Sequence, residues 1–213
     1  MPDVSRWSAL RRSRAGLRRS FQSVELFANL TAGENIAVGC DDGRRRNYLT
    51  DLVRPGKVQL SDEARIAIQT FRLGSVLDTP IEALSFGDRR LVAIARAVAS
   101  GPSVLLLDEP AAGLSDREAS ELAELVRSLA HDWGIAVLLI EHNIDMVLSV
   151  CDTVTVLVEG RVLACGTSEE IRANTSVLAA YLGDDARALD VDTFVAQNWG
   201  TDETLSADRA GRS

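Results

Sequence analysis

Cysteine is scarce in this sequence, and the thiols form no close pair. The three cysteines are Cys40, Cys151 and Cys165, and no two of them make a Cys-x-x-Cys motif. An odd number of cysteines without an export signal is typical of proteins from a reducing compartment. We therefore expect thiols that pack in the core or have no chemical role, and no disulfide framework.

Long apolar runs are also lacking. The longest have six residues, Ile135–Ile140 and Val177–Leu182, whereas a membrane-spanning helix needs about 20. The chain nevertheless has 213 residues, of which 46% are apolar and 25% are charged. This composition is sufficient for a buried core, so it excludes a disordered chain and favours one globular domain that does not cross a membrane.

A strong positive charge is missing too. The formal net charge is -8, and the basic residues gather in residues 1–20, which hold six arginines against Asp3. Residues 183–213 have the opposite balance, with seven acidic and three basic residues. Binding to a nucleic-acid backbone requires clustered cations, so this balance argues against a general nucleic-acid binder. Both ends are interpreted as solvated surface or frayed termini.

Alternating strand-like and helix-like stretches predict an α/β fold in the middle of the chain. Val104–Leu107 is a wholly apolar run that ends in Asp108-Glu109, which is typical of a buried strand. Apolar residues then recur at helical spacing from Asp116 until Gly134, and a second buried strand, Ile135–Ile140, is predicted to follow at once. A strand, a helix and a strand in immediate succession imply a right-handed crossover and parallel pairing.

Other elements follow from capping residues and turn signals. Ser61 opens a helix that Gly74 closes, and Thr31 with Glu34 fits a capping box at the start of another helix. The remaining predicted elements are a helix over Arg89–Ser100, a short helix over Asn143–Val150, a hairpin of Thr153–Val158 and Arg161–Cys165 that turns at Glu159-Gly160, and one or two helices over Glu169–Leu182.

Two pairs of residues are candidate functional sites. Ligands of parallel sheets bind beyond the carboxyl ends of the strands, so Asp108 and Glu109 lie where a metal and a reacting group would be. Acids at a strand end that merely enters solvent give the same pattern. Ser85 and Gly87 precede a helix whose free amides favour an anion, although an ordinary serine N-cap is the alternative.

Taken together, these segments resemble ABC-type ATPases. The stretch LSFGDRRLVAIARAVASGPSVLLLDEP resembles the signature, helix and Walker B block of that family, and RRSFQSVELFANLT is similar to its Q-loop. His142 lies 33 positions after Glu109, in the place of the family's switch histidine. Three further segments, DEPAAGLS, LIEHNIDMV and EEIRANTSVLAAYLG, are most similar to the sequences of ATP-binding subunits of branched-chain amino acid importers. The resemblance covers about Arg18–Gly183.

The resemblance implies a role in ATP hydrolysis for each matching residue. Asp108 would help to hold Mg²⁺, partly through water, and Glu109 would polarise or deprotonate the attacking water. His142 would contact the γ-phosphate of ATP, and Gln22 would touch the metal or the water. Glu109, His142 and Gln22 are thus the expected catalytic residues. Asp108 and Gln22 are the expected Mg²⁺ ligands.

The resemblance also implies two kinds of partner. The signature residues Ser85, Gly87 and Asp88 would bind ATP that is held by a second ABC ATPase subunit, because the family closes two domains head to tail. Transmembrane permease subunits would dock at Val24, Leu26 and Phe27, near the Q-loop. The chain would then be cytoplasmic and peripheral, on the inner face of the plasma membrane.

Some residues depart from the family pattern. Asp88 stands where a glutamine is usual, and Ser115 stands where Asp or Asn is common. No Walker A loop, G-x-x-x-x-G-K-[ST], is present: the single lysine, Lys57, has Asp51 in place of the first glycine, and no hydroxyl residue follows it. We therefore expect weak nucleotide binding and little or no hydrolysis by this chain alone.

The predicted fold is a P-loop NTPase-like ABC nucleotide-binding domain, N-terminally truncated and with a helical signature subdomain. Its expected parts are a remnant or linker over 1–17, the Q-loop and signature part over 18–101, the Walker B to switch-histidine core with a C-terminal hairpin and helices over 102–183, and an acidic tail over 184–213.

Three functions remain open at this point. We favour the ATPase subunit that energises an importer of branched-chain or related amino acids. The second is an ABC-domain fragment that acts as an interaction or regulatory protein without turnover. The third is a soluble, non-transport ABC ATPase, a class whose members usually carry two such domains.

Overall fold

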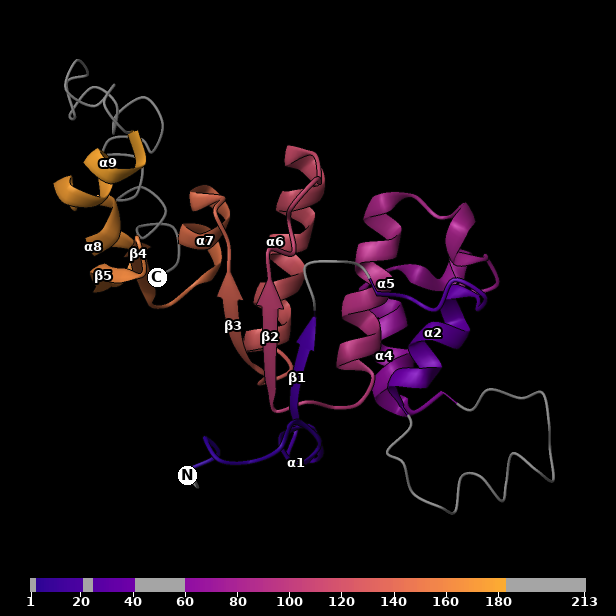
Figure 1. Ribbon diagram of the computed structural model, residues 1–213. Helices are drawn as coiled ribbons and strands as arrows, with labels where there is room; N and C mark the ends of the chain where they lie inside the picture. Colours follow the sequence, from indigo (N-terminus) through magenta and orange to yellow (C-terminus); the bar gives the residue numbers. More distant parts are fainter. Residues whose placement is uncertain (1–2, 21–24, 41–59, 183–213) are drawn as a thin grey trace, which may run out of the picture. The chain divides into compact units, whose positions relative to one another are not determined.

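The structure is a computed structural model that describes residues 3–20, 25–40 and 60–182 (Figure 1). The chain divides into two compact units, of which the first ends at Met146 and the second begins at Val147. Gln22, Val24 and Lys57 lie outside the described residues, as does the expected acidic tail. No helix in the described ranges is long and apolar enough to span a membrane.

A parallel sheet lies in the first unit. Its strands are β1 (Leu17–Ser20), β2 (Val104–Asp108) and β3 (Ala136–Ile140), in the order β1-β2-β3. Both pairs of neighbours run parallel, so the carboxyl ends of the three strands lie at one edge of the sheet (Figure 1). The predicted parallel pairing of the two apolar strands is confirmed. The predicted burial of the second strand is wrong, because Leu138 and Ile140 of β3 are 58% and 55% exposed. An apolar run shows that a strand can be buried, but the elements that would cover it are not visible in the run itself.

The connection between β2 and β3 is the amphipathic helix α6 (Asp116–His131). It begins with a capping box, in which Ser115 and Glu118 each accept the other's backbone N–H. Its apolar residues Leu122, Val126 and Leu129 are almost fully buried, and each such burial contributes about 1.5–3 kcal/mol. The spacing that predicted the helix is therefore the spacing of its buried face.

Several helices and 3-10 turns make up much of the remaining first unit. They are α1 (Ala9–Arg14), α2 (Ala32–Gly39), α4 (Asp62–Thr70), η1 (Leu73–Val76), η2 (Ile81–Ala83) and α5 (Phe86–Val98). The capping box of Thr31 and Glu34 is confirmed at the start of α2. α2 and α5 pack so closely that a Cβ on Gly39 would lie 2.1 Å from the backbone oxygen of Arg96. A glycine is therefore required at this contact.

One predicted helix boundary is wrong. α4 begins after the predicted N-cap Ser61, but it ends at Thr70 and not at Gly74. Arg72 has a φ of 54°, in the left-handed region that stops an α-helix, and Gly74 lies inside η1. The left-handed role that glycine usually takes at a helix end is taken here by an arginine, which leaves no mark in the sequence.

The second unit contains the predicted hairpin. Its strands β4 (Val154–Val158) and β5 (Arg161–Gly166) pair antiparallel, and the chain turns at Glu159 and Gly160, whose φ angles are 49° and 76°. Two left-handed residues in succession are typical of a type I′ turn, which matches the twist of antiparallel strands. The predicted helices are confirmed as α7 (Ile144–Val150) before the hairpin, and α8 (Ser168–Arg172) and α9 (Thr175–Leu182) after it.

Candidate functional site

The carboxylate of Asp108, at the end of β2, forms an ion pair. Nη2 of Arg19, on the neighbouring strand β1, donates to Asp108 Oδ2 over 2.8 Å. Arg19 is half exposed, so water screens the pair and its net contribution to stability is about 0–1 kcal/mol. Its effect is to orient Asp108. A role for Arg19 was not predictable from the sequence, because an exposed basic residue on a short strand carries no distinctive pattern.

The backbone of Glu109 turns sharply where β2 ends. Its φ is 45°, in the left-handed region that residues other than glycine rarely adopt. The Glu109 N–H donates to the carbonyl oxygen of Ile140, the last residue of β3, over 2.8 Å. Strain of this kind, of order 1–3 kcal/mol, is concentrated at functional sites. As predicted, Asp108 and Glu109 stand at the carboxyl end of a strand with buried residues.

A third carboxylate, Glu141, directly follows β3, and none of its side chain is exposed. Its Oε1 accepts the N–H of Ala111 over 2.7 Å, and its Oε2 accepts those of His142 and Asn143 over 3.1 and 3.4 Å. Glu141 thus joins the loop after β2 to the turn after β3. No role for Glu141 was predicted beyond its place before His142, although an acid that ends an apolar strand was a signal in the sequence.

His142 lies in the turn after β3, whose backbone N–H groups donate to the Glu141 carboxylate. Its side chain is 73% exposed, and its Nδ1 is 3.9 Å from Glu141 Oε2. Because β2 and β3 are parallel neighbours, this turn and the loop with Glu109 leave the sheet at the same edge. The structure therefore places Asp108, Glu109 and His142 at one sheet edge. The fourth expected residue, Gln22, is outside the described residues.

Ser85 is the N-cap of α5, and its hydroxyl group bonds within the chain. It accepts the N–H of Asp88 over 3.0 Å and donates to Asp88 Oδ2 over 2.7 Å. A Cβ on Gly87 would lie 2.6 Å from Oε1 of Glu118, in the first turn of α6. The N-cap interpretation of Ser85 is confirmed. Two carboxylates lie beside the helix N-terminus that was expected to favour an anion.

A buried arginine links the start of α5 to the same sheet edge. Arg90 is only 2% exposed, its Nη2 donates to the carbonyl oxygen of Ala112 over 3.1 Å, and its guanidinium carbon lies 5.3 Å from the centre of the Phe86 ring. Burial lowers the pKa of Arg90, while the charges of Glu141 and Glu109 oppose that change. Helical periodicity predicts apolar residues on a buried face, so it did not identify Arg90.

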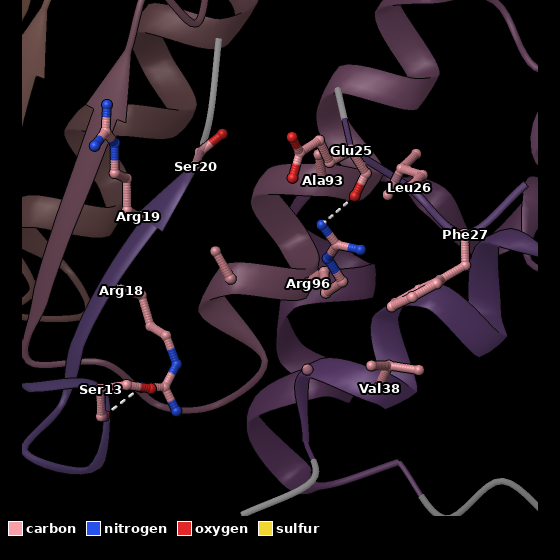
Figure 2. Close-up of a pocket in the computed structure, with 12 residues that line it drawn as sticks. Ser13, Arg18, Arg19, Ser20, Glu25, Leu26, Phe27, Val38, Ala93 and Arg96 are labelled. Carbon is pink, nitrogen blue, oxygen red and sulfur yellow. Dashed lines mark hydrogen bonds between the residues drawn. The ribbon is translucent and has the colours of Figure 1, made fainter. Parts of the chain in front are cut away.

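A second candidate site is a pocket of about 510 Å³ that residues of β1, α2, α5 and the segment 25–27 line (Figure 2). The expected docking residues Leu26 and Phe27 line it, and Val24 is outside the described residues. Arg96 of α5 donates to the carbonyl oxygen of Glu25 over 2.5 Å, and its guanidinium carbon lies 5.6 Å from the centre of the Phe27 ring. Burial lowers the pKa of Arg96.

The oxygen atoms at the strand ends suit a magnesium ion that phosphates help to bind. Mg²⁺ is usually held by one or two carboxylates together with water and substrate phosphates, and Asp108 supplies one carboxylate. Oδ2 of Asp108 is already in the ion pair with Arg19. In the described part of the chain, no group of three or more His, Cys, Asp or Glu could hold a metal ion. The residues therefore fit a cation that arrives with a phosphate.

Two family models match this chain. The one described as "ABC transporter" matches residues 2–112, which is more than half of the 213 residues. The one described as "Branched-chain amino acid ATP-binding cassette transporter" matches residues 161–187. The first match begins well before Arg18, where the similarity visible in the motifs starts.

Known proteins give the same result. The high-affinity branched-chain amino acid transport ATP-binding protein BraF of Pseudomonas aeruginosa is 35% identical over 81% of this chain and 69% of its own length. MJ1267, an ATP-binding cassette of an ABC transporter in its ADP conformation, has a TM-score of 0.69 and 26% identity, over 86% of this chain and 74% of its own. For cbiO1 of Clostridium perfringens, part of the ABC transporter complex cbiONQ, the TM-score is 0.63 at 27% identity. The match covers 81% of this chain and 64% of the cbiO1 chain.

Proposed function

This chain belongs to the ABC transporter family, and we propose that it is an ATP-binding subunit that energises an importer of branched-chain or related amino acids. The observation that carries the proposal is the match of residues 161–187 to the branched-chain family model. That segment lies in the second unit, well after the Walker B-like strand end. The similarity to BraF over 81% of the chain supports the same conclusion.

In this proposal the residues at the sheet edge share the chemistry, and hydrolysis requires a phosphate-binding loop in addition, because this sequence contains no Walker A motif. Glu109 orients a water molecule and accepts its proton at a carboxylate oxygen. The bond from its N–H to Ile140 supports this role, because it fixes the backbone from which the carboxylate extends. The exposed His142 donates a hydrogen bond to the terminal phosphate. Bound Mg²⁺ would neutralise charge on the phosphate oxygens. Asp108 and Gln22 would help to hold the ion, partly through its bound water.

We further propose that Ser85, Gly87 and Asp88 contact a nucleotide held by a second subunit. Ser85 is exposed at the start of α5, where backbone N–H groups face away from the helix. The carboxylates of Asp88 and Glu118 oppose a bare phosphate at this position. These carboxylates repel a nucleotide less strongly when Mg²⁺ already neutralises part of its charge. We therefore expect the Mg²⁺-bound nucleotide to be the form that binds here.

The pocket of Figure 2 is the proposed docking site of the membrane partner. Phe27 is 48% exposed and Leu26 lines the same pocket, so an apolar side chain of a permease has a surface to contact. Arg96 holds the backbone of Glu25 beside it. The proposal therefore places the chain on the inner face of the membrane, bound through its permease.

The test is amino acid uptake in cells that carry Glu109→Gln in place of the native gene. We expect uptake of leucine, isoleucine, valine or a related amino acid to fall by about 100-fold, because the variant keeps the side-chain shape and removes the proton acceptor. The matched control is Glu121→Gln, on the exposed side of α6, where Glu121 pairs with Arg117 at 2.9 Å. Its uptake should equal that of the native protein.

The amount of protein in the cells is measured by immunoblot for both variants. Normal uptake of every amino acid tested, with Glu109→Gln present at the native level, contradicts the proposal. Equal losses in Glu109→Gln and Glu121→Gln also contradict it, because Glu121 is exposed and its substitution removes a surface ion pair with Arg117.

A further inference from the structure

The carboxylate of Glu141 is buried more completely than that of Asp108, and the proposed chemistry does not use it. None of its side chain is exposed, whereas the Asp108 side chain is 24% exposed. A buried carboxylate is costly unless hydrogen bonds or charges compensate for the lost water. The three backbone N–H groups of Ala111, His142 and Asn143 provide this compensation.

These three N–H groups come from two segments that the sequence separates. Ala111 lies two residues after Glu109, in the loop that follows β2, and His142 and Asn143 form the turn that follows β3. Oε1 bonds the first segment and Oε2 bonds the second. A single carboxylate therefore fixes the spacing between the backbone that carries Glu109 and the backbone that carries His142.

A second contact extends the same cluster to α5. Arg90 donates to the carbonyl oxygen of Ala112, the residue after the one that Glu141 bonds, and its guanidinium lies in the field of the Glu141 charge. Hydrogen bonds that involve an ionised group are stronger than neutral ones. The loop after β2 is thus held from both sides, by a buried anion and by a buried cation.

We propose that Glu141 is a positioning residue, whose buried carboxylate keeps the Glu109 loop and the His142 turn together as one rigid unit. Its relevance to catalysis rests on the proposed function, because only there do Glu109 and His142 act on one phosphate. Its structural part does not, because the three hydrogen bonds exist without a nucleotide.

Amide hydrogen exchange of the full chain, followed by NMR without nucleotide, tests the proposal. In Glu141→Ala we expect exchange at Ala111, His142 and Asn143 to become at least about tenfold faster, since each N–H loses a charged acceptor. Amides inside β2 should keep their native rates. The control is Glu170→Ala, which removes an exposed acid that accepts the Thr167 N–H over 2.8 Å in the second unit.

Glu141→Gln gives a sharper result and guards against misfolding of the alanine variant. Its side chain has the same shape, but only one of its two terminal atoms can accept a hydrogen bond. Protection should therefore persist either at Ala111 or at the pair His142 and Asn143, and be lost at the other. A role in packing alone predicts native rates at all three amides, because the shape is unchanged.

Two results would overturn the inference. One is native exchange at all three amides in both variants. The other is an equal acceleration at these amides and throughout β2, which would mean that Glu141 only supports global stability. Neither result depends on transport, so normal amino acid uptake in Glu109→Gln would refute the proposed function and leave the positioning by Glu141 intact.

Discussion

Glycine at position 109 is expected to give a more stable first unit than alanine at the same position. The φ of Glu109 is 45°, and a left-handed conformation costs a residue with a Cβ about 1–2 kcal/mol. Glycine avoids this cost but loses more conformational entropy on folding, by about 0.5–1 kcal/mol. Glu109→Gly should therefore exceed Glu109→Ala in unfolding free energy by about 0.5–1 kcal/mol. Both variants lack the carboxylate, so its charge does not enter the comparison.

Urea unfolding followed by circular dichroism measures this difference, with the same slope expected for both variants. The control is the same pair of substitutions at Glu121, in the interior of the right-handed helix α6. There glycine should be less stable than alanine by about 1 kcal/mol. The two positions should thus give opposite signs.

Glycine less stable than alanine at both positions would refute the reasoning. It would mean that position 109 carries no left-handed strain, and the backbone argument for a functional turn after β2 would fail with it. The test uses stability alone, so it does not depend on any substrate or partner.

Three further predictions concern other parts of the chain. Gly39→Ala should lower the unfolding free energy by about 1–3 kcal/mol in urea titration, because its Cβ would lie 2.1 Å from the Arg96 oxygen; native stability would contradict this contact. Hydrogen bonds from Ser115 lower the pKa of Glu118, so its stabilising effect is present at neutral pH and is lost as the pH falls through that lowered pKa. Glu118→Gln should therefore destabilise the chain at pH 7 and progressively less as the pH falls below about 4, where an ordinary glutamate becomes protonated, and an equal loss at every pH would contradict the linkage. Burial raises the pKa of the Cys151 thiol, so iodoacetamide at about pH 8 should alkylate it more slowly than the exposed Cys165, as peptide mass spectrometry would show.

Apolar patterns predicted β2, β3 and the crossover helix α6, but not β1, whose sequence LRRS has one apolar residue. The runs that became β2 and β3 have four or more consecutive apolar residues, and the buried face of α6 repeats at helical spacing. The buried residues of β2 and α6 depend on hydrophobic burial, which the order of residue types displays directly, whereas Leu138 and Ile140 of β3 are exposed. Capping residues such as Ser115 likewise mark helix starts, because their side chains bond locally.

The contacts of charged residues could not be predicted in the same way. Arg90 and Glu141 are buried only because partners that are distant in the sequence compensate for their charges, and Arg72 ends a helix with a backbone conformation that its type disfavours. Such pairings arise from the tertiary fold and leave no period in the sequence. Family motifs identified Asp108, Glu109 and His142, whereas the residues that hold them became visible in three dimensions.

The close approach of α2 and α5 at Gly39 connects the wall of the pocket to the N-terminus of α5. Ser85 caps one end of this helix, and Arg96, eleven residues further on, bonds the backbone of Glu25 at the pocket. At a rise of 1.5 Å per residue these two positions are about 16 Å apart along a stiff helix. Because the two backbones approach closely at Gly39, we expect a tilt of α2 at the pocket to move α5 as well. Ser85 and Arg96 lie on the same helix, so a displacement of the pocket wall should also shift Ser85.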